Sequence, residues 1–128
     1  NSMKRMSFVF IVVAALVACS SSSKLKGNRQ YLKEYAFCKC FQFASGDTSY
    51  FINDATLSMY ADLANYNNTV YEKIDSLVSR NVSTFLPNII ADYENKKAVF
   101  WNCFRFYKSN QLDSAVKKMD KESRRSWK

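Results

Sequence analysis

Glycine and proline are scarce in this chain, and that scarcity limits the folds that it can form. The 128 residues include two glycines and one proline, whereas Ala, Lys and aromatic residues are abundant. A β-rich fold of this size needs many tight turns, and Gly and Pro are the residues that commonly supply them. The length allows at most one domain. The sequence therefore predicts an all-α fold, a small bundle of four to five helices.

The first eighteen residues have the pattern of an export signal. Two basic residues precede an apolar run from Phe8 to Val17, which is shorter than the ~20 residues needed to span a bilayer. The run ends in Leu16-Val17-Ala18-Cys19, which resembles the bacterial lipobox, whose Cys becomes the lipidated N-terminus. The alternative is a buried N-terminal helix with an incidental Cys19. We expect residues 1–18 to be a signal peptide and Cys19 to be lipidated.

The exported part is expected to consist of an anchor, a domain and a tail. Residues 19–28 hold the lipidated Cys and a polar tether rich in Ser and Lys. Ser20, directly after the Cys, favours the outer membrane over retention in the inner one. Residues 29–123 form the helical domain, and residues 124–128 form a basic tail. The expected location is thus the periplasm, with the membrane contacted only through the lipid anchor.

Positive charge is concentrated near the C-terminus. The formal net charge is +8, and the segment from Lys117 to Lys128 holds six basic residues against two acidic ones. An exported protein meets little nucleic acid, so the charge does not indicate nucleic-acid binding. We interpret the segment as a solvated helix end, one that could touch anionic lipid.

Apolar residues recur at helical spacing in several segments. The predicted helices are residues 29–45, residues 54–64, a helix that starts with the capping box Thr69-Val70-Tyr71-Glu72, residues 98–107, and a last helix capped by Ser109 or Asn110. Pro87 either ends or bends the third of these helices. Segment 98–107 is aromatic enough to be a strand, but no second strand candidate exists to pair with it, which favours a buried helix. Gly46 and Asp47 stop the first helix.

Two of these helices have apolar faces that carry cysteines. The first helix places Leu32, Ala36, Cys40, Phe43 and Ala44 on one face, and the helix over 98–107 places Cys103 beside Phe100, Phe104 and Tyr107. Both faces are expected to point into the core.

With Cys19 used for lipid, Cys38, Cys40 and Cys103 remain, and an oxidising compartment favours one disulfide among them. Cys38 points about 200° away from Cys40 around a helix, so both cannot reach Cys103. A bridge between Cys38 and Cys40 would strain the helix. Face geometry favours Cys40 as the partner of Cys103, with Cys38 as the alternative.

The residues needed for most catalytic chemistry are missing. The sequence has no His, which excludes Ser-His and Cys-His nucleophilic catalysis and most zinc sites. Cys38-Lys39-Cys40 is not the redox Cys-x-x-Cys spacing, and no Gly-rich phosphate loop exists. The sequence predicts a binding protein without enzymatic activity, cofactor or metal.

Aromatic side chains outside the predicted helices are candidate anchors for a partner. They are Tyr50, Tyr66, Tyr93 and Trp127. Large side chains with no core to join are common contact residues in protein interfaces. The alternative for each is that it lies flat on the domain surface.

Four stretches carry a family resemblance. They are Tyr35–Phe41 (YAFCKCF), Ala61–Leu63 (ADL), Tyr71–Val78 (YEKIDSLV) and Asn102–Leu112 (NCFRFYKSNQL). Together they resemble the immunity proteins that neutralise the fourth class of peptidoglycan amidase effectors of the type VI secretion system. The resemblance extends from about Tyr31 to Lys118.

The resemblance implies a periplasmic, all-helical, homodimeric protein that occludes the papain-like Cys-His active site of an amidase. The family places a loop in the amidase cleft, ahead of the helix that holds the second disulfide Cys. Here that position is Asp92 to Lys97, and the expected contact residues are Asp92, Tyr93, Glu94, Asn95 and Lys96. Asp92 or Glu94 could meet the amidase His as a charge partner. The lipid anchor is a departure from the soluble forms associated with the family.

Two other functions fit the same features. The first is an envelope lipoprotein that acts as a helical structural or assembly adaptor, and the second is an inhibitor of a host lysozyme. An immunity gene lies beside the gene of its toxin, which would separate it from an adaptor.

Overall fold

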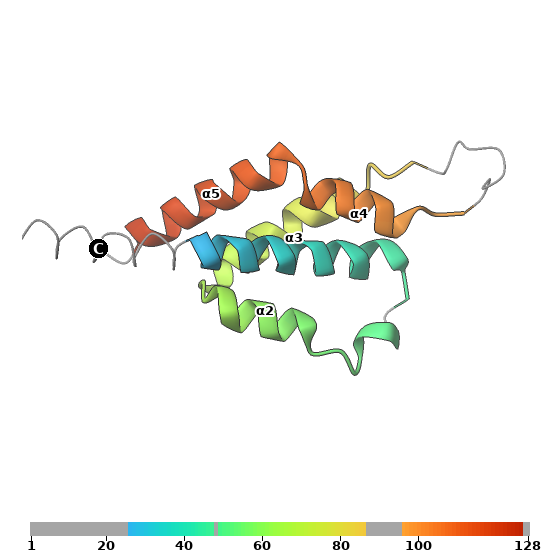
Figure 1. Ribbon diagram of the computed structural model, residues 1–128, viewed down its shortest axis with the longest axis horizontal. Coiled ribbons are helices and arrows are strands. Elements are labelled where there is room, and N and C mark those ends of the chain that lie inside the picture. The colour runs from blue at the N-terminus through green and yellow to red at the C-terminus, as the bar shows by residue number, and fades with distance from the viewer. Residues whose placement is uncertain (1–25, 48, 87–95, 127–128) are drawn as a thin grey trace, which may run out of the picture.

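The computed structural model describes residues 26–47, 49–86 and 96–126, and the regular elements in this part of the chain are all helices, without strands. The elements are an N-terminal helix described over residues 26–45, the 3₁₀ helix η1 (Ser49–Phe51), α2 (Thr56–Ala64), α3 (Asn68–Val82), α4 (Val99–Tyr107) and α5 (Asn110–Arg125) (Figure 1). The predicted all-α bundle is confirmed. The backbone is helical from Lys26, three residues before the domain was expected to begin.

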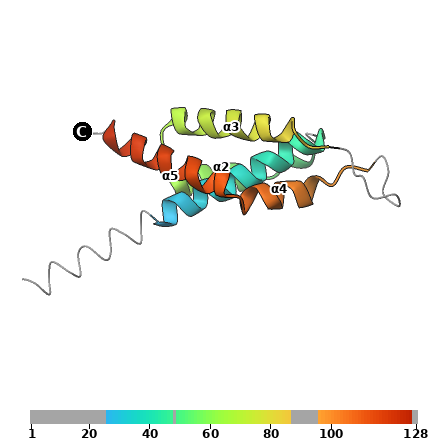
Figure 2. The same ribbon diagram turned by 90° about the horizontal axis from the view of Figure 1, so that it is seen from above.

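The N-terminal helix is the central element of the bundle. It is the blue-to-cyan ribbon of Figures 1 and 2, with α2, α3 and the α4–α5 pair placed around it. Leu32, Ala36 and Cys40 are fully shielded from solvent, and Ala44 is also buried. These positions recur every four residues, so they lie on one face of the helix. The predicted face is therefore confirmed, except that Phe43 is 40% exposed.

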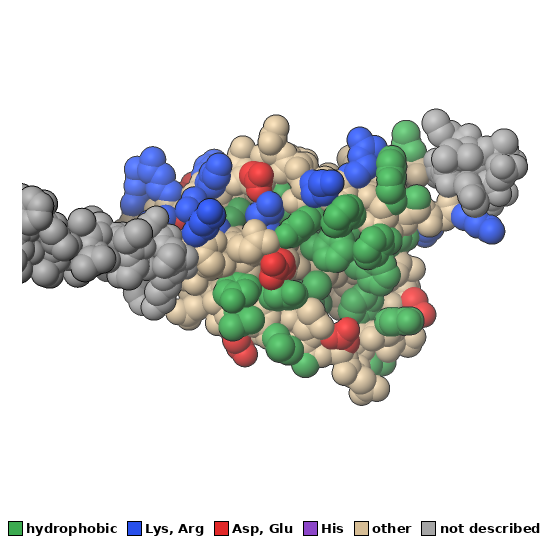
Figure 3. Space-filling view, in the orientation of Figure 1, with side chains coloured by type: hydrophobic (Ala, Val, Ile, Leu, Met, Phe, Trp, Pro, Cys, Tyr) green, Lys and Arg blue, Asp and Glu red, His purple; other side chains and the backbone are tan. Residues whose placement is uncertain are grey.

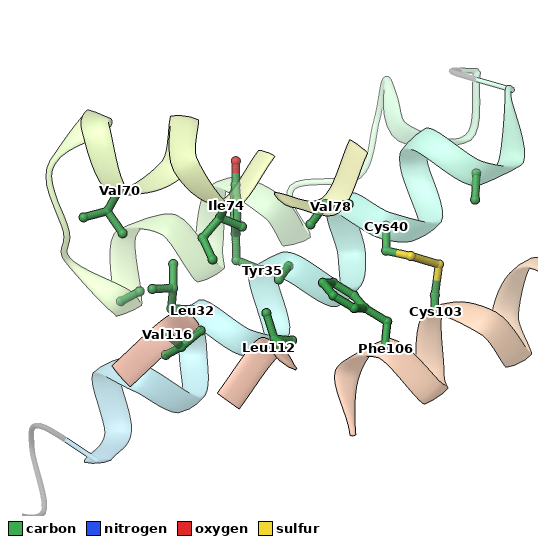
Figure 4. Close-up of a cluster of buried hydrophobic side chains, with 13 residues drawn as sticks. Leu32, Tyr35, Cys40, Val70, Ile74, Val78, Cys103, Phe106, Leu112 and Val116 are labelled. Atoms are coloured by element: carbon green, nitrogen blue, oxygen red, sulfur yellow. A yellow bond between two sulfur atoms is a disulfide. The ribbon is translucent and has the colours of Figure 1, made fainter. Parts of the chain in front are cut away.

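The other helices complete a single small core around this face (Figure 4). Their buried apolar residues are Ala64 of α2, Val70, Ile74 and Val78 of α3, Cys103 and Phe106 of α4, and Leu112 and Val116 of α5. The i, i+4, i+8 spacing in α3 gives one narrow apolar stripe, as expected for a helix packed on one side.

Local capping decides where the helices begin and end. The side chain of Asn67 accepts a hydrogen bond from the Val70 amide at 3.2 Å, so α3 starts one residue before the predicted capping box. The extended backbone of Asn67 lets its side-chain oxygen reach an amide in the first turn of the helix. Ser109 caps α5 in the same way through the Leu112 amide. Gly46 ends the N-terminal helix with a φ of +68°, a conformation that Gly adopts without steric cost.

The rotation of α4 differs from the prediction. Cys103 and Phe106 are buried, whereas Phe100 is 61% exposed and Phe104 is 43% exposed. A nine-residue helix that packs on one side can bury only one stripe. The disulfide fixes that stripe on Cys103, and the residue three positions later shares it. The expectation that Phe100 and Phe104 face the core was wrong.

A disulfide joins Cys40 of the N-terminal helix to Cys103 of α4, with 5.7 Å between their Cα atoms. This is the pairing that face geometry favoured. Cys38, two residues away, remains a half-buried free thiol. We call the Cys40–Cys103 contact the disulfide junction.

A buried carboxylate joins the same N-terminal helix to α5. Asp120 is 2% exposed and accepts a hydrogen bond from the Tyr66 hydroxyl at 2.8 Å. It also forms ion pairs with Arg124 and, at 3.8 Å, with Arg29 of the N-terminal helix. We call this contact the Asp120 junction. It links the N-terminal helix, the α2–α3 connection and α5, and sequence reasoning did not anticipate it.

Candidate functional site

The part of the chain described by the structure contains no group of three or more His, Cys, Asp or Glu side chains that could hold a metal ion. None of its helices is long and apolar enough to cross a membrane. The search for a site therefore turns to surfaces and cavities that could receive another molecule.

The connection between α3 and α4 was predicted to carry the contact residues. Asp92, Tyr93, Glu94 and Asn95 lie outside the described residues, whereas Lys96 is described and exposed. The flanking ends of α3 and α4 lie at one end of the bundle, away from the first described turn of the N-terminal helix and from the C-terminal end of α5 (Figure 1). We call this the loop end of the molecule.

A cavity of about 420 Å³ lies at the loop end, where three helices meet. Its described lining residues are Phe43 and Ala44 from the N-terminal helix, Val82 at the end of α3 with Phe85 and Leu86 just after it, and Lys96, Lys97 and Ala98 just before α4 with Val99 and Asn102 in its first turn. The walls are largely apolar, and two lysines stand on the α4 side. Such a cavity suits an apolar side chain of a partner.

Trp101 and Arg105 form an exposed pair on the outer side of α4. The Arg105 guanidinium lies 4.7 Å from the centroid of the Trp101 ring, and 59% of Trp101 is exposed. Stacking keeps the guanidinium over the ring, which reduces the conformational freedom lost on binding. Trp and Arg are the residues most enriched in the energetic centres of protein interfaces.

An interlocked set of rings covers the contact between the N-terminal helix and α4, and we call it the aromatic face. It consists of Phe37, Phe41, Phe100, Phe104 and Tyr107. Phe37 has its ring centroid 5.8 Å from that of Phe100 and 5.7 Å from that of Tyr107. In the space-filling view, hydrophobic side chains gather over these elements, with Lys and Arg side chains along the upper edge of the group (Figure 3). A contiguous exposed patch of this kind is typical of a protein interaction site.

A second cavity, of about 240 Å³, opens at the edge of the aromatic face toward η1 and α2. It is lined by Phe37, Cys38, Phe41, Tyr50, Phe51, Asp54, Thr56, Leu57 and Phe100. Burial, and then the carboxylates of Asp54 and Glu34, raise the pKa of the Cys38 thiol. A raised pKa leaves little thiolate at neutral pH, so the cavity suits binding of an apolar group rather than nucleophilic chemistry.

The aromatic anchors expected in loops are only part of the exposed aromatic surface. Tyr50 is 79% exposed, but Tyr66 is half-buried and its hydroxyl donates a hydrogen bond to Asp120. Tyr93 and Trp127 lie outside the described residues. Phe100 and Trp101 were missed because they sit in a predicted core helix. The sequence did contain a signal for their exposure. Apolar residues occupy most of the circumference of α4, and a single buried stripe cannot hold all of them.

The described part of the molecule is thus a small all-helical bundle with one disulfide and exposed aromatic side chains. Residues 30–116 match the Tai4 family, described as Type VI secretion system (T6SS), amidase immunity protein. The chain belongs to this family, and the resemblance inferred from the sequence is confirmed. Comparisons with curated proteins and with solved structures found no match.

Proposed function

We propose that this chain is an exported, lipid-anchored immunity protein that binds a peptidoglycan amidase effector in the periplasm and covers its active site. The family match over residues 30–116 carries the proposal. Occlusion requires shape and anchor residues rather than catalytic groups, which agrees with a sequence that contains no His. The lipid on Cys19 would hold the protein at the outer membrane.

The segment from Asp92 to Lys96 is proposed to enter the amidase cleft. Lys96 lies seven residues before Cys103, which the disulfide junction attaches to the central helix. A segment attached to a fixed helix loses less freedom on binding than a segment between mobile elements. Trp101 lies five residues after Lys96, and Arg105 stacks on it from the next turn of α4, so this pair is proposed to contact the rim of the cleft.

We also propose that two copies of the chain pair, as the family resemblance implies. Phe100 and Phe104 of the aromatic face are 61% and 43% exposed, and burying them against a second copy would remove a large apolar area from water. Sedimentation equilibrium over a range of concentrations would measure the pairing, and a monomer at all concentrations would contradict it.

A toxicity rescue tests the immunity function directly. The amidase encoded beside this gene would be exported to the periplasm of a test bacterium, with and without this protein. We expect the wild-type chain to prevent lysis, and we expect Tyr93→Ala/Glu94→Ala to restore it. The matched control is Met59→Ala/Glu72→Ala, which removes a large exposed side chain from α2 and an exposed carboxylate from α3.

The outcomes separate the function from the interface. Absence of rescue by the wild type would contradict the immunity function and favour a helical envelope adaptor. Rescue that survives Tyr93→Ala/Glu94→Ala would keep the function and move the interface to another surface. Circular dichroism of the purified variants establishes that both pairs of substitutions leave the helices intact.

A further inference from the structure

The outer side of α5 carries a group of positive charges, which we call the basic face. It consists of Lys117, Lys118, Lys121, Arg124 and Arg125, all of them exposed. At about 100° per residue these five side chains lie on the side of the helix opposite the buried Leu112 and Val116. The apolar stripe of α5 is used by the core, so the basic face has no apolar residue of its own.

Most of this charge is not neutralised by ion pairs within the described part of the chain. Every carboxylate of α5 already has a cation: Asp113 pairs with Lys33 at 2.6 Å, Glu122 with Lys73 at 3.0 Å, and Asp120 with Arg29 and Arg124. Lys117, Lys118, Lys121 and Arg125 form no ion pair with any other described residue.

The basic face lies at the end of the molecule where the anchor would attach. The Arg29–Asp120 ion pair places the first turns of the N-terminal helix beside the C-terminal half of α5, and Figures 1 and 2 show the two at the same end. Cys19 precedes Lys26 by seven residues. A fully extended chain of that length spans at most about 25 Å, so a lipid on Cys19 keeps this end near the membrane surface.

The composition of the basic face favours a lipid surface over a protein partner. Protein interfaces are depleted of Lys at their centres and enriched in aromatic anchors, and this face has three Lys and no aromatic residue. Anionic headgroups require only positive charge and no complementary shape. The face also lies outside the family match, which ends at residue 116, so it is not explained by the proposed immunity function.

We propose that the basic face of α5 binds the anionic headgroups of phospholipids. The contact adds to the lipid on Cys19, which belongs to the proposed function, but it does not require that lipid. Its consequence is orientation: the basic face lies against the membrane, and the loop end points away from it. The segment proposed to enter the amidase is then presented to the periplasm.

Vesicle flotation tests this binding in the absence of any amidase. The mature chain with Cys19→Ser, which cannot be lipidated, would be mixed with phosphatidylcholine vesicles with or without phosphatidylglycerol. We expect the protein to bind only the vesicles that contain phosphatidylglycerol, and we expect high salt to release it. Each basic residue near such a surface strengthens binding by about fivefold. Neutralising Lys117, Lys118, Lys121 and Arg125 together to Gln should therefore weaken binding roughly a hundredfold or more.

A charge-matched control isolates the position of the charges from their number. It changes Arg80, Lys96, Lys97 and Lys108 to Gln, four exposed cations on α3 and at α4. This variant should keep most of the vesicle binding. Equal loss in both variants, binding to pure phosphatidylcholine, or binding that persists in high salt would overturn the proposal. An amidase that binds the wild type but not the α5 variant would also overturn it, because the face would then belong to the effector interface.

Discussion

The N-terminal helix is held to α4 and to α5 by two different kinds of contact. The disulfide junction to α4 is a covalent bond surrounded by the aromatic face. The Asp120 junction to α5 is a buried carboxylate with three polar partners. The disulfide junction depends on the redox state of its compartment, and the Asp120 junction depends on the protonation of the Tyr66 hydroxyl, whose pKa is raised. We therefore expect that each contact can be weakened without the other, although α4 and α5 are joined by a single short connection.

The two junctions also relate differently to the proposed function. The match to the immunity family covers both cysteines of the disulfide junction, but it excludes Arg29 and Asp120. The disulfide junction supports the helix that follows the proposed contact segment, whereas the Asp120 junction supports the basic face. Selective weakening of each junction should therefore affect different ends of the molecule.

Removal of the disulfide junction should have the largest effect on stability. The bond closes a loop with a sequence separation of 63 residues, which corresponds to about 4 kcal/mol in the chain-entropy description. Cys40→Ala/Cys103→Ala should lower the free energy of unfolding by about that amount, as measured by urea denaturation. Cys38→Ala is the control, and it should change stability far less. A similar loss in both variants would mean that the cysteines contribute by packing rather than by the bond.

Removal of the carboxylate at the Asp120 junction should have an intermediate effect. Asp120→Ala leaves the half-buried Tyr66 hydroxyl without its acceptor, and it should cost about 1–3 kcal/mol of unfolding free energy. Asp113→Ala, which removes the more exposed Asp113–Lys33 ion pair, should cost less than about 1 kcal/mol. Equal costs for the two changes would show that burial of Asp120 adds nothing to stability.

A rise in pH should change the free energy of unfolding least of the three tests. The change should be small near neutrality and larger in alkaline solution. Burial, and then the hydrogen bond and charge of Asp120, raise the pKa of Tyr66 above its ordinary value of 10.0. The unfolded chain then releases the phenolic proton at a lower pH than the folded chain. The stability contributed by Tyr66 is therefore complete below about pH 10, and it is lost as the pH rises toward the raised pKa.

Urea denaturation at increasing pH checks this expectation. Tyr66→Phe cannot lose a phenolic proton, so its stability should fall less steeply above about pH 10 than that of the wild type. Tyr50→Phe, at a position that is 79% exposed, serves as the control and should follow the wild type. Identical slopes for all three proteins would contradict an alkaline weakness at the Asp120 junction.

Much of the fold could be read from periodicity, and the errors have a common cause. Leu32, Ala36 and Cys40 repeat every four residues, and that spacing identifies a buried helical face without knowledge of the neighbours. In α4 almost every position is apolar, so no spacing stands out. The choice between Phe104 and Phe106 as the buried residue then depended on the helix that α4 meets. The candidate site was harder still, because exposure depends on which elements pack together.

By itself, the sequence determined the helical class, the buried face of the central helix and the exclusion of His-dependent chemistry. These properties follow from residue type and local spacing. Only the tertiary structure decided that Phe100 and Trp101 are exposed, that Cys40 rather than Cys38 is bonded, and that Asp120 is buried. The partners Tyr66 and Asp120 are 54 residues apart in the chain. No local pattern encodes such a contact, because it forms only when the helices pack around a shared core.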